Sequence, residues 1–241
     1  MATVGGRAWS QSFLALMLAL PPLGAQAIAA PIAPPPIISP AGAVVGGAAL
    51  VSAFLLDASW RRSIQDARSP LTDDLATVGN AFGDGRYALP VVGGTWLAGR
   101  LLHAPAIERI GRRAGLAYLA GGAATFVLQE AVGRSRPNEG GDASEYHPFS
   151  GHASFPSGHT TVVFAMATAL ADETPHRWVR VLLYSGATLT GFARMNDDRH
   201  WLSDVVAGAI VGVVSVRVLD RVGPGIWVGP DGLRVGVRRG I

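Results

Sequence analysis

The sequence predicts an all-α fold, a helical bundle of about six core helices, and three observations carry that prediction. Of the 241 residues, 49% are hydrophobic and only 15% are charged, whereas soluble domains carry about 25% charged residues. Segments rich in alanine, leucine and glycine follow one another with breaks at glycines and prolines, as in helices joined by short turns. Strand-like alternation of polar and apolar residues occurs only near the C-terminus. Helices are expected at about residues 41–57, 70–82, 88–103, 106–133, 158–172, 176–194 and 200–220.

The N-terminus has the pattern of an export signal. Arg7 precedes the apolar run Phe13–Leu20, and Ala25-Gln26-Ala27 has the small-x-small form that a signal peptidase cleaves. Residues 1–27 are therefore expected to be a signal peptide, and an uncleaved N-terminal anchor is the alternative.

The rest of the chain divides into three parts. Residues 28–40 are rich in proline, which cannot continue a helix, and are expected to form an extended spacer. Residues 41–221 would form the helical domain. In residues 222–241, Ile226-Trp227-Val228 and Leu233-Arg234-Val235 flank a turn sequence, so a short hairpin is expected, with an irregular tail as the alternative.

Whether the helices cross a membrane is left open by the sequence. Only Ile37–Leu56 gives twenty uncharged residues in a row, and a span needs about that many. If six helices span, most arginines at helix ends share one side, and the positive-inside rule directs the opposite side away from the cytoplasm. That predicts an inner-membrane protein of the cell envelope with an extracytoplasmic site. These arginines are Arg100, Arg109, Arg112, Arg113, Arg177, Arg180, Arg217 and Arg221.

A cleaved signal is incompatible with that topology. Cleavage would place residue 28 outside, and a spanning 37–56 segment would then carry the predicted site back inside. The alternative is therefore a soluble periplasmic or surface-bound bundle.

Charge and cysteine content exclude several classes of function. The net charge of +3 comes from scattered arginines, without the basic stripe and interleaved aromatic residues of a nucleic-acid surface. The absence of cysteine excludes disulfides, thiolate zinc sites and cysteine nucleophiles. His147 and His152 lie in a polar loop, where solvated histidines are more common than metal ligands, so neither a metal nor a cofactor is expected.

Three clusters of chemically active residues point to one phosphate site. They are Gly133-Arg134-Ser135-Arg136-Pro137, the run Ser154–Thr160, and Arg194 followed by His200 and Asp204. Phosphoryl transfer through a phosphohistidine needs fixed positive charge, a nucleophile, an acid and an orienting carboxylate, and these clusters contain all four.

The second cluster has the features of a helix start that binds an anion. Pro156 and Ser157 precede an apolar run, and Ser157 is expected to cap the helix. Gly158 permits close approach of backbone to a ligand, and the free N–H groups of the first turn attract phosphate. His159 would then lie within reach of the leaving oxygen. The alternative is an ordinary capped helix with a surface histidine.

The third cluster supplies the predicted nucleophile. His200 and Asp204 are four residues apart and would share one helix face, so Asp204 could fix the imidazole tautomer. The other ring nitrogen of His200 would then be unprotonated and directed at phosphorus. Arg194 would hold the equatorial oxygens. The alternative is an exposed ion pair contributing about 0.3 kcal/mol.

From about Gln129 to Asp204, the chain resembles the type 2 phosphatidic acid phosphatase and vanadium haloperoxidase superfamily. The resemblance implies a metal-independent acid-type phosphatase with a phosphatidic acid phosphatase/haloperoxidase-like bundle and a lipid phosphate, diphosphate or small phosphate ester as substrate. It assigns catalysis to His200, His159 and Asp204. It assigns phosphate binding to Arg136, Ser157, Gly158, Arg194 and the position of Gln129.

Two positions depart from the family pattern. Gln129 stands where the family has lysine, and Ala193 where it usually has serine. Arg134 could supply the missing charge. Two alternatives stay open: a vanadate-dependent haloperoxidase, because vanadate copies the trigonal-bipyramidal phosphate, and a non-catalytic envelope protein that binds phosphate, for which Gln129 is the reason.

Overall fold

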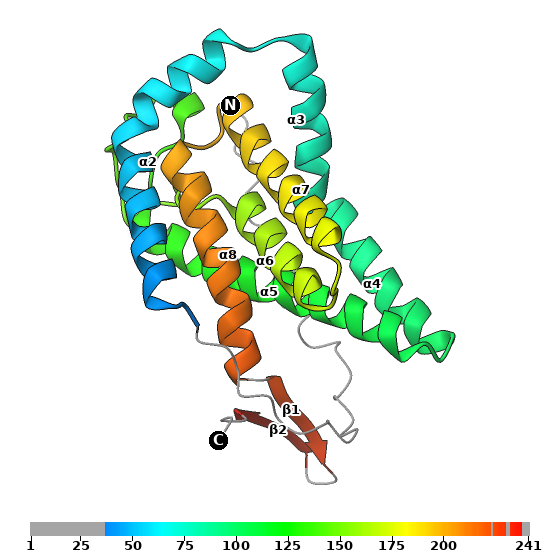
Figure 1. Ribbon diagram of the computed structural model, residues 1–241. Coiled ribbons are helices and arrows are strands. Elements are labelled where there is room, and N and C mark those ends of the chain that lie inside the picture. Colours follow the sequence, from blue (N-terminus) through cyan, green and yellow to red (C-terminus); the bar gives the residue numbers. More distant parts are fainter. Residues whose placement is uncertain (1–36, 223, 230–231, 238–241) are drawn as a thin grey trace, which may run out of the picture. The chain divides into compact units, whose positions relative to one another are not determined.

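The computed structural model describes residues 37–222, 224–229 and 232–237, and it confirms the all-α prediction. All seven expected segments are helical in the part from residue 37 to 222 (Figure 1). The predicted signal sequence and most of the spacer lie outside the described residues. The helices are α2 (Pro40–Asp66), α3 (Pro70–Gly83), α4 (Gly85–Leu101), α5 (Pro105–Val132), the 3-10 helix η1 (Pro137–Glu139), α6 (Gly158–Asp172), α7 (Arg177–Asn196) and α8 (Leu202–Val222).

Two compact units make up the chain. Residues 36–218 form the helical unit, and the segment from Leu219 onward belongs to a second unit. In that segment, β1 (Pro224–Gly229) and β2 (Gly232–Val237) pair antiparallel, with Gly229 opposite Gly232.

Local sequence explains where several helices begin. The Ser39 hydroxyl accepts the N–H of Gly42, and Ser69 forms a capping box with Thr72. Asp84 caps α4 by accepting the N–H of Arg86. Side chains that accept the free N–H groups of a first turn favour a helix start at the next residue.

Helix α2 continues to Asp66, nine residues beyond its expected end at residue 57. Charged residues at and after the expected end have partners inside the helical unit: Asp57 is 1% exposed and bonds to Arg134, and Arg61 bonds to Asp198. A charged side chain that is paired inside the protein can be buried, so the helix can continue through it.

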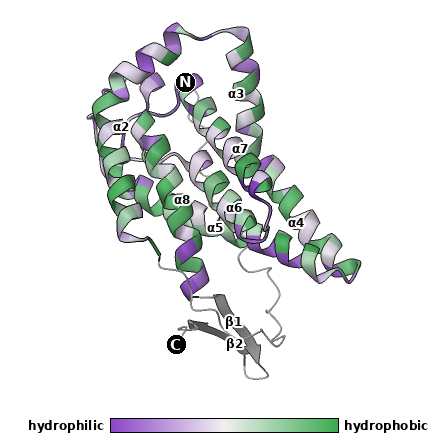
Figure 2. Cartoon of the chain, in the orientation of Figure 1, coloured by the Kyte–Doolittle hydropathy of each residue, from purple (hydrophilic) through white to green (hydrophobic). Residues whose placement is uncertain are grey.

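The interior of the helical unit consists mainly of small side chains. Its core cluster is Ala117, Ala165, Ala169 and Val216. Large apolar residues lie on the outside: Leu55 is 81% exposed and Val44 is 72% exposed. Figure 2 shows hydrophobic residues along the outer faces of α2 and α4. Small residues between helices and large apolar residues outside are the distribution found in membrane bundles.

Two helices of the described part, α2 and α8, are long and apolar enough to cross a membrane. The most apolar window of α2 is only 11% buried and that of α8 is 33% buried. These two helices therefore fit a membrane protein, whereas α5, α6 and α7 do not meet the same test.

Candidate active site

The three sequence clusters meet at one end of the helical unit. They follow α5, begin α6, end α7 and begin α8 (Figure 1). Backbone bonds join them: the Ser154 N–H donates to the Arg134 carbonyl at 3.1 Å, and the Ser157 N–H donates to the Asp204 carbonyl at 2.9 Å. The residues of the three clusters therefore lie together at this end of the helical unit.

Glycines make this close approach possible. A Cβ on Gly208 would lie 2.8 Å from the Ser157 carbonyl oxygen, and one on Gly212 would lie 2.5 Å from the Thr161 carbonyl oxygen. Helices α6 and α8 therefore touch backbone to backbone. Gly133 ends α5 with φ of 59°, where a Cβ would overlap the His147 carbonyl.

His200 is buried and held by one strong hydrogen bond. Its Nδ1 lies 2.8 Å from the carbonyl oxygen of Ser154. A carbonyl only accepts, so Nδ1 carries the proton and Nε2 carries the lone pair. Burial lowers the pKa of His200, which favours the neutral, nucleophilic form.

The predicted role of Asp204 needs a correction. Its Oδ2 lies 3.6 Å from Nδ1 of His200, beyond hydrogen-bond distance. The four-residue spacing does not put both side chains on one helix face, because α8 begins at Leu202 and His200 precedes it. The Ser154 carbonyl fixes the tautomer, and Asp204 supplies a nearby negative charge.

The carboxylate of Asp204 is fully buried and accepts hydrogen bonds from three donors. Oδ1 accepts from Arg134 at 2.6 Å, and Oδ2 accepts from the Ser154 hydroxyl at 2.5 Å and the Trp201 N–H at 2.9 Å. Bonds from donors alone match an ionised carboxylate. Ser154 therefore contacts the site twice, through its hydroxyl and its carbonyl.

Arg134 is a structural arginine with no N–H left for a ligand. Its Nη1 donates to Asp204 at 2.6 Å and Ser203 at 2.7 Å, and its Nη2 donates to Asp57 at 2.7 Å. Nε and Nη2 also donate to the Ala143 carbonyl. A guanidinium has five N–H groups, and all five are used. The hypothesis that Arg134 replaces the missing lysine charge on phosphate is therefore wrong.

Arg136 and Arg194 are placed differently, because each keeps an unused donor. Arg136 donates to the Ala153 carbonyl at 3.3 Å and Arg194 donates to Asn80 at 2.7 Å. The Nε of each is buried without a hydrogen-bond partner. Burial lowers both pKa values, that of Arg194 to about 10, and repulsion from Arg199 contributes to both. An oxyanion between them would satisfy both donors.

Ser157 occupies the residue before α6, but it does not cap the helix with its side chain. Its hydroxyl accepts from the Thr160 hydroxyl at 2.9 Å, and it accepts no backbone N–H of the first turn. The predicted cap is therefore wrong. The first N–H groups of α6, including that of Gly158, remain the ones a helix leaves without internal partners, so they suit an anion.

His159 is largely buried, and a Cβ on Gly83 of α3 would lie 2.9 Å from its Cβ. Burial, helped by the positive charge of Arg194, lowers the pKa of His159 to about 3. The unliganded site therefore contains a neutral His159. A bound phosphate adds negative charge and favours its protonated form.

Gln129 takes a positioning role that the sequence did not indicate. Its Nε2 donates to the Pro156 carbonyl at 2.9 Å, two residues ahead of α6. The amide therefore holds the segment that leads into the anion-binding helix. It adds no charge at the position where the resemblance expects lysine.

The two histidines of the polar loop have exposed side chains and lie beside carboxylates. His147 contacts Glu145 at 2.9 Å and His152 contacts Glu139 at 3.4 Å. Within the described residues, no group of three His, Cys, Asp or Glu side chains is arranged to hold a metal.

Sequence reasoning missed four buried residues of this end: Asp57, Arg134 as an ion-pair partner, Ser154 and Ser203. Ser154 and Arg134 lie inside the clusters, so their position was a usable signal. Asp57 is a lone acid in an apolar helix, and nothing near it in sequence connects it to the site.

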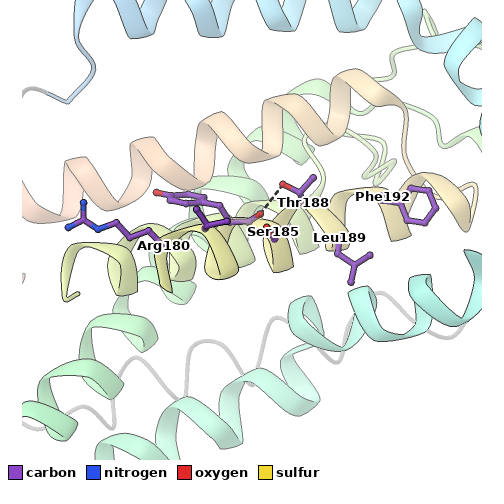
Figure 3. A pocket seen from close by; sticks show the side chains of 7 residues that line it. Arg180, Ser185, Thr188, Leu189 and Phe192 are labelled. Atoms are coloured by element: carbon purple, nitrogen blue, oxygen red, sulfur yellow. Dashed lines mark hydrogen bonds between the residues drawn. The ribbon is translucent and has the colours of Figure 1, made fainter. Parts of the chain in front are cut away.

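A groove of about 640 Å³ lies along α7, away from these residues. Figure 3 shows its lining, where the Thr188 hydroxyl donates to the Tyr184 carbonyl at 2.8 Å. None of the predicted site residues lines it, so the polar site and this mostly apolar groove are separate. The lining residues are Arg180, Val181, Tyr184, Ser185, Thr188, Leu189 and Phe192.

Known structures share this fold. The crystal structure of LpxE from Aquifex aeolicus superimposes with a TM-score of 0.51 at 24% identity, covering 68% of this chain and 93% of that one. The first transmembrane PAP2 type phosphatidylglycerolphosphate phosphatase from Bacillus subtilis gives 0.52 at 22% identity, covering 71% and 94%. At these identities the likeness concerns the fold.

Sequence comparisons concern the segment that contains the three clusters. A lipid A 1-phosphatase from Rhizobium etli is 37% identical over 115 residues, which are 44% of this chain and 49% of that protein. The chain spans about half or less of the length of the curated relatives it matches. Residues 111–224 match the PAP2 superfamily, and the lipid A 1-phosphatase relatives and the shared fold support the type 2 phosphatidic acid phosphatase superfamily.

Proposed function

We propose that this protein is a metal-independent lipid phosphatase that works through a phosphohistidine on His200. One observation carries the proposal: a buried imidazole, with Nδ1 committed to the Ser154 carbonyl, lies within electrostatic reach of two arginines whose Nε groups lack partners. A lone pair next to unsatisfied positive donors fits an attack on a phosphate ester.

The reaction follows in two steps. Nε2 of His200 forms a bond to phosphorus while the bond to the leaving oxygen breaks, and His159 gives that oxygen a proton. Water then attacks the phosphohistidine, His159 accepts a proton from the water, and the bond between phosphorus and Nε2 breaks to release phosphate and free His200. Arg136, Arg194 and the first turn of α6 stabilise the charge on the transferred oxygens.

A lipid substrate is supported by the relatives and by the outer surface. The Rhizobium relative bears the name lipid A 1-phosphatase, and one from Arabidopsis thaliana is a probable lipid phosphate phosphatase. The exposed apolar residues of α2 favour membrane association. We therefore propose a lipid phosphate monoester or diphosphate as substrate.

We further propose that the site faces away from the cytoplasm in the inner membrane. Arginines gather at the end of the helical unit opposite the site, where Arg109 pairs with Glu173 and Arg217 pairs with Asp172. Positive charge at the cytoplasmic ends of helices supports this orientation.

A substrate screen tests the proposal. The full chain would be purified in detergent and assayed for phosphate release from a lipid A 1-phosphate, phosphatidylglycerol phosphate, phosphatidate, undecaprenyl diphosphate and a soluble monoester. Turnover of at least one lipid is expected. Phosphate binding without release from any of the five would instead favour the non-catalytic alternative.

A chelator is expected to leave that activity unchanged, because the proposed steps use only side chains and water. Orthovanadate is expected to inhibit competitively, since it adopts the geometry of the phosphoryl group in the transition state. Initial rates with and without EDTA, and a vanadate inhibition series at several substrate concentrations, measure both. Activity lost in EDTA and restored by one divalent ion would contradict the mechanism.

The acidic limb of the pH profile is expected below pH 6.5. His200 must be neutral to attack, and its pKa is lowered by burial. As the pH falls, activity should therefore persist below the ordinary histidine pKa of about 6.5 and be lost only when His200 is protonated. A profile of kcat/KM from pH 4 to 8 measures the limb, and a limb above 6.5 would argue against a buried neutral nucleophile.

A further inference from the structure

We propose that Asp57 of α2 is a positioning residue of the active site that acts through Arg134 on the charge beside His200. The inference rests on the proposed function, because it takes His200 as the nucleophile. Asp57 lies outside residues 111–224, which match the superfamily. The helix that carries it is also one of the two candidate membrane spans.

Asp57 is the first of three polar residues on one face of α2. Asp57, Arg61 and Gln65 follow one another at four-residue spacing, which aligns them along a helix. Each contacts a segment that carries the first or the third cluster. Their partners are, in that order, Arg134 and Ser203, then Asp198 and the Pro137 carbonyl, then the carbonyls of Met195 and Asn196.

The contacts of Asp57 are those of an ionised carboxylate. It is 1% exposed, and it accepts from Arg134 at 2.7 Å, from the Ser203 N–H at 2.8 Å and from the Ser203 hydroxyl at 2.6 Å. Every partner is a donor. Ser203 is the second residue of α8, so Asp57 also accepts one of the N–H groups that the start of that helix leaves unpaired.

The charge balance explains why Asp57 matters for chemistry. Arg134 is shared between two buried carboxylates, Asp57 and Asp204, at 2.7 Å and 2.6 Å. Two negative charges against one positive charge leave the group formed by Asp57, Arg134 and Asp204 with a net charge of minus one. Oδ2 of Asp204 lies 3.6 Å from His200, so this excess negative charge stabilises the positive charge that the imidazole gains as it attacks phosphorus.

Removing the Asp57 charge would change this balance without touching the groups that face His200. Those groups are Asp204 from α8, Arg194 from α7, Arg136 from the segment after α5 and His159 from α6. Arg134 would then neutralise Asp204 alone, and the group of these three residues would carry no net charge. The imidazolium form of His200 would lose stabilisation.

The test compares Asp57→Asn with Asp66→Asn. Asp66 is an exposed aspartate at the end of the same helix, so the same change there controls for the loss of one charge. Asp57→Asn is expected to lower kcat about 10- to 100-fold with KM within about twofold. It should also lower the pKa of His200 by about 0.5 to 1 unit, measured by NMR of histidine-labelled protein and assigned with His200→Ala. Asp66→Asn should change neither.

Each outcome decides the matter. Equal behaviour of the two variants, or a lower thermal midpoint of Asp57→Asn with kcat and the His200 pKa unchanged, would reduce Asp57 to a structural role and overturn the proposal. If Asp57→Asn does not fold, Asp57→Glu decides: it retains the charge, so kcat and a His200 pKa close to the wild-type values support the proposal, and a kcat at least 10-fold lower with an unchanged His200 pKa refutes it. A wild type without turnover would defeat the proposed function, while the NMR titration would still test Asp57.

Discussion

His200→Ala is expected to lower kcat/KM by about 10⁴-fold or more on every phosphate ester that the wild type hydrolyses. The reason is that no neighbouring side chain can form the bond to phosphorus in its place. The fold should persist at a cost of about 1–3 kcal/mol, because the Ser154 carbonyl loses its partner. Steady-state kinetics in detergent and a thermal unfolding curve measure the two effects separately.

His147→Ala is the matched control, since His147 is an exposed loop histidine and its loss should leave kcat/KM within about twofold. His159→Ala supplies a further check with a substrate that has a good leaving group. It should still transfer phosphate to His200, so an acid-labile, base-stable phosphoprotein should accumulate. Substantial turnover by His200→Ala would eliminate the mechanism. So would a phosphoprotein that still forms when His200 is replaced.

The helices could be predicted because the residues that begin and end them lie at the helix ends in the sequence. Prolines and capping side chains mark the starts of α2 and α3, and Gly133 marks the end of α5. Boundaries that depend on tertiary contacts could not be predicted in the same way. The end of α2 was expected at residue 57, but the helix continues to Asp66, and the partner that permits the burial of Asp57 is 77 residues away in Arg134.

In the site, too, the sequence motifs could be predicted, whereas the contacts between residues far apart in the sequence could not. The three clusters were visible as patterns, and the structure brings them to one end of the bundle. What spacing could not reveal is which donor meets which acceptor. The pair His200 and Asp204 has helical spacing, but the helix begins between them, so the carbonyl of Ser154 takes the position assigned to the carboxylate.

Arg134→Ala is expected to cause the largest loss of stability. The change leaves Asp57 and Asp204 buried without their shared cation, and breaking a buried ion pair from one side costs about 3–5 kcal/mol. For a chain of this size the thermal midpoint should fall by roughly 6–20 °C. Arg62→Ala, at an exposed position of α2, is the control and should shift the midpoint by less than about 2 °C. Differential scanning fluorimetry in detergent measures both.

Combining this change with Gln129→Lys separates the two roles that sequence and structure give to Arg134. If Arg134 served the phosphate, the new lysine would rescue the alanine variant by more than it helps the wild type. Because all five N–H groups of Arg134 are committed to protein oxygens, we expect no such rescue. The lysine should change kcat/KM by the same factor in both backgrounds, with a coupling below about 0.5 kcal/mol in a double-mutant cycle. A larger coupling, with Gln129→Lys restoring turnover but not the thermal midpoint, would return Arg134 to the phosphate site.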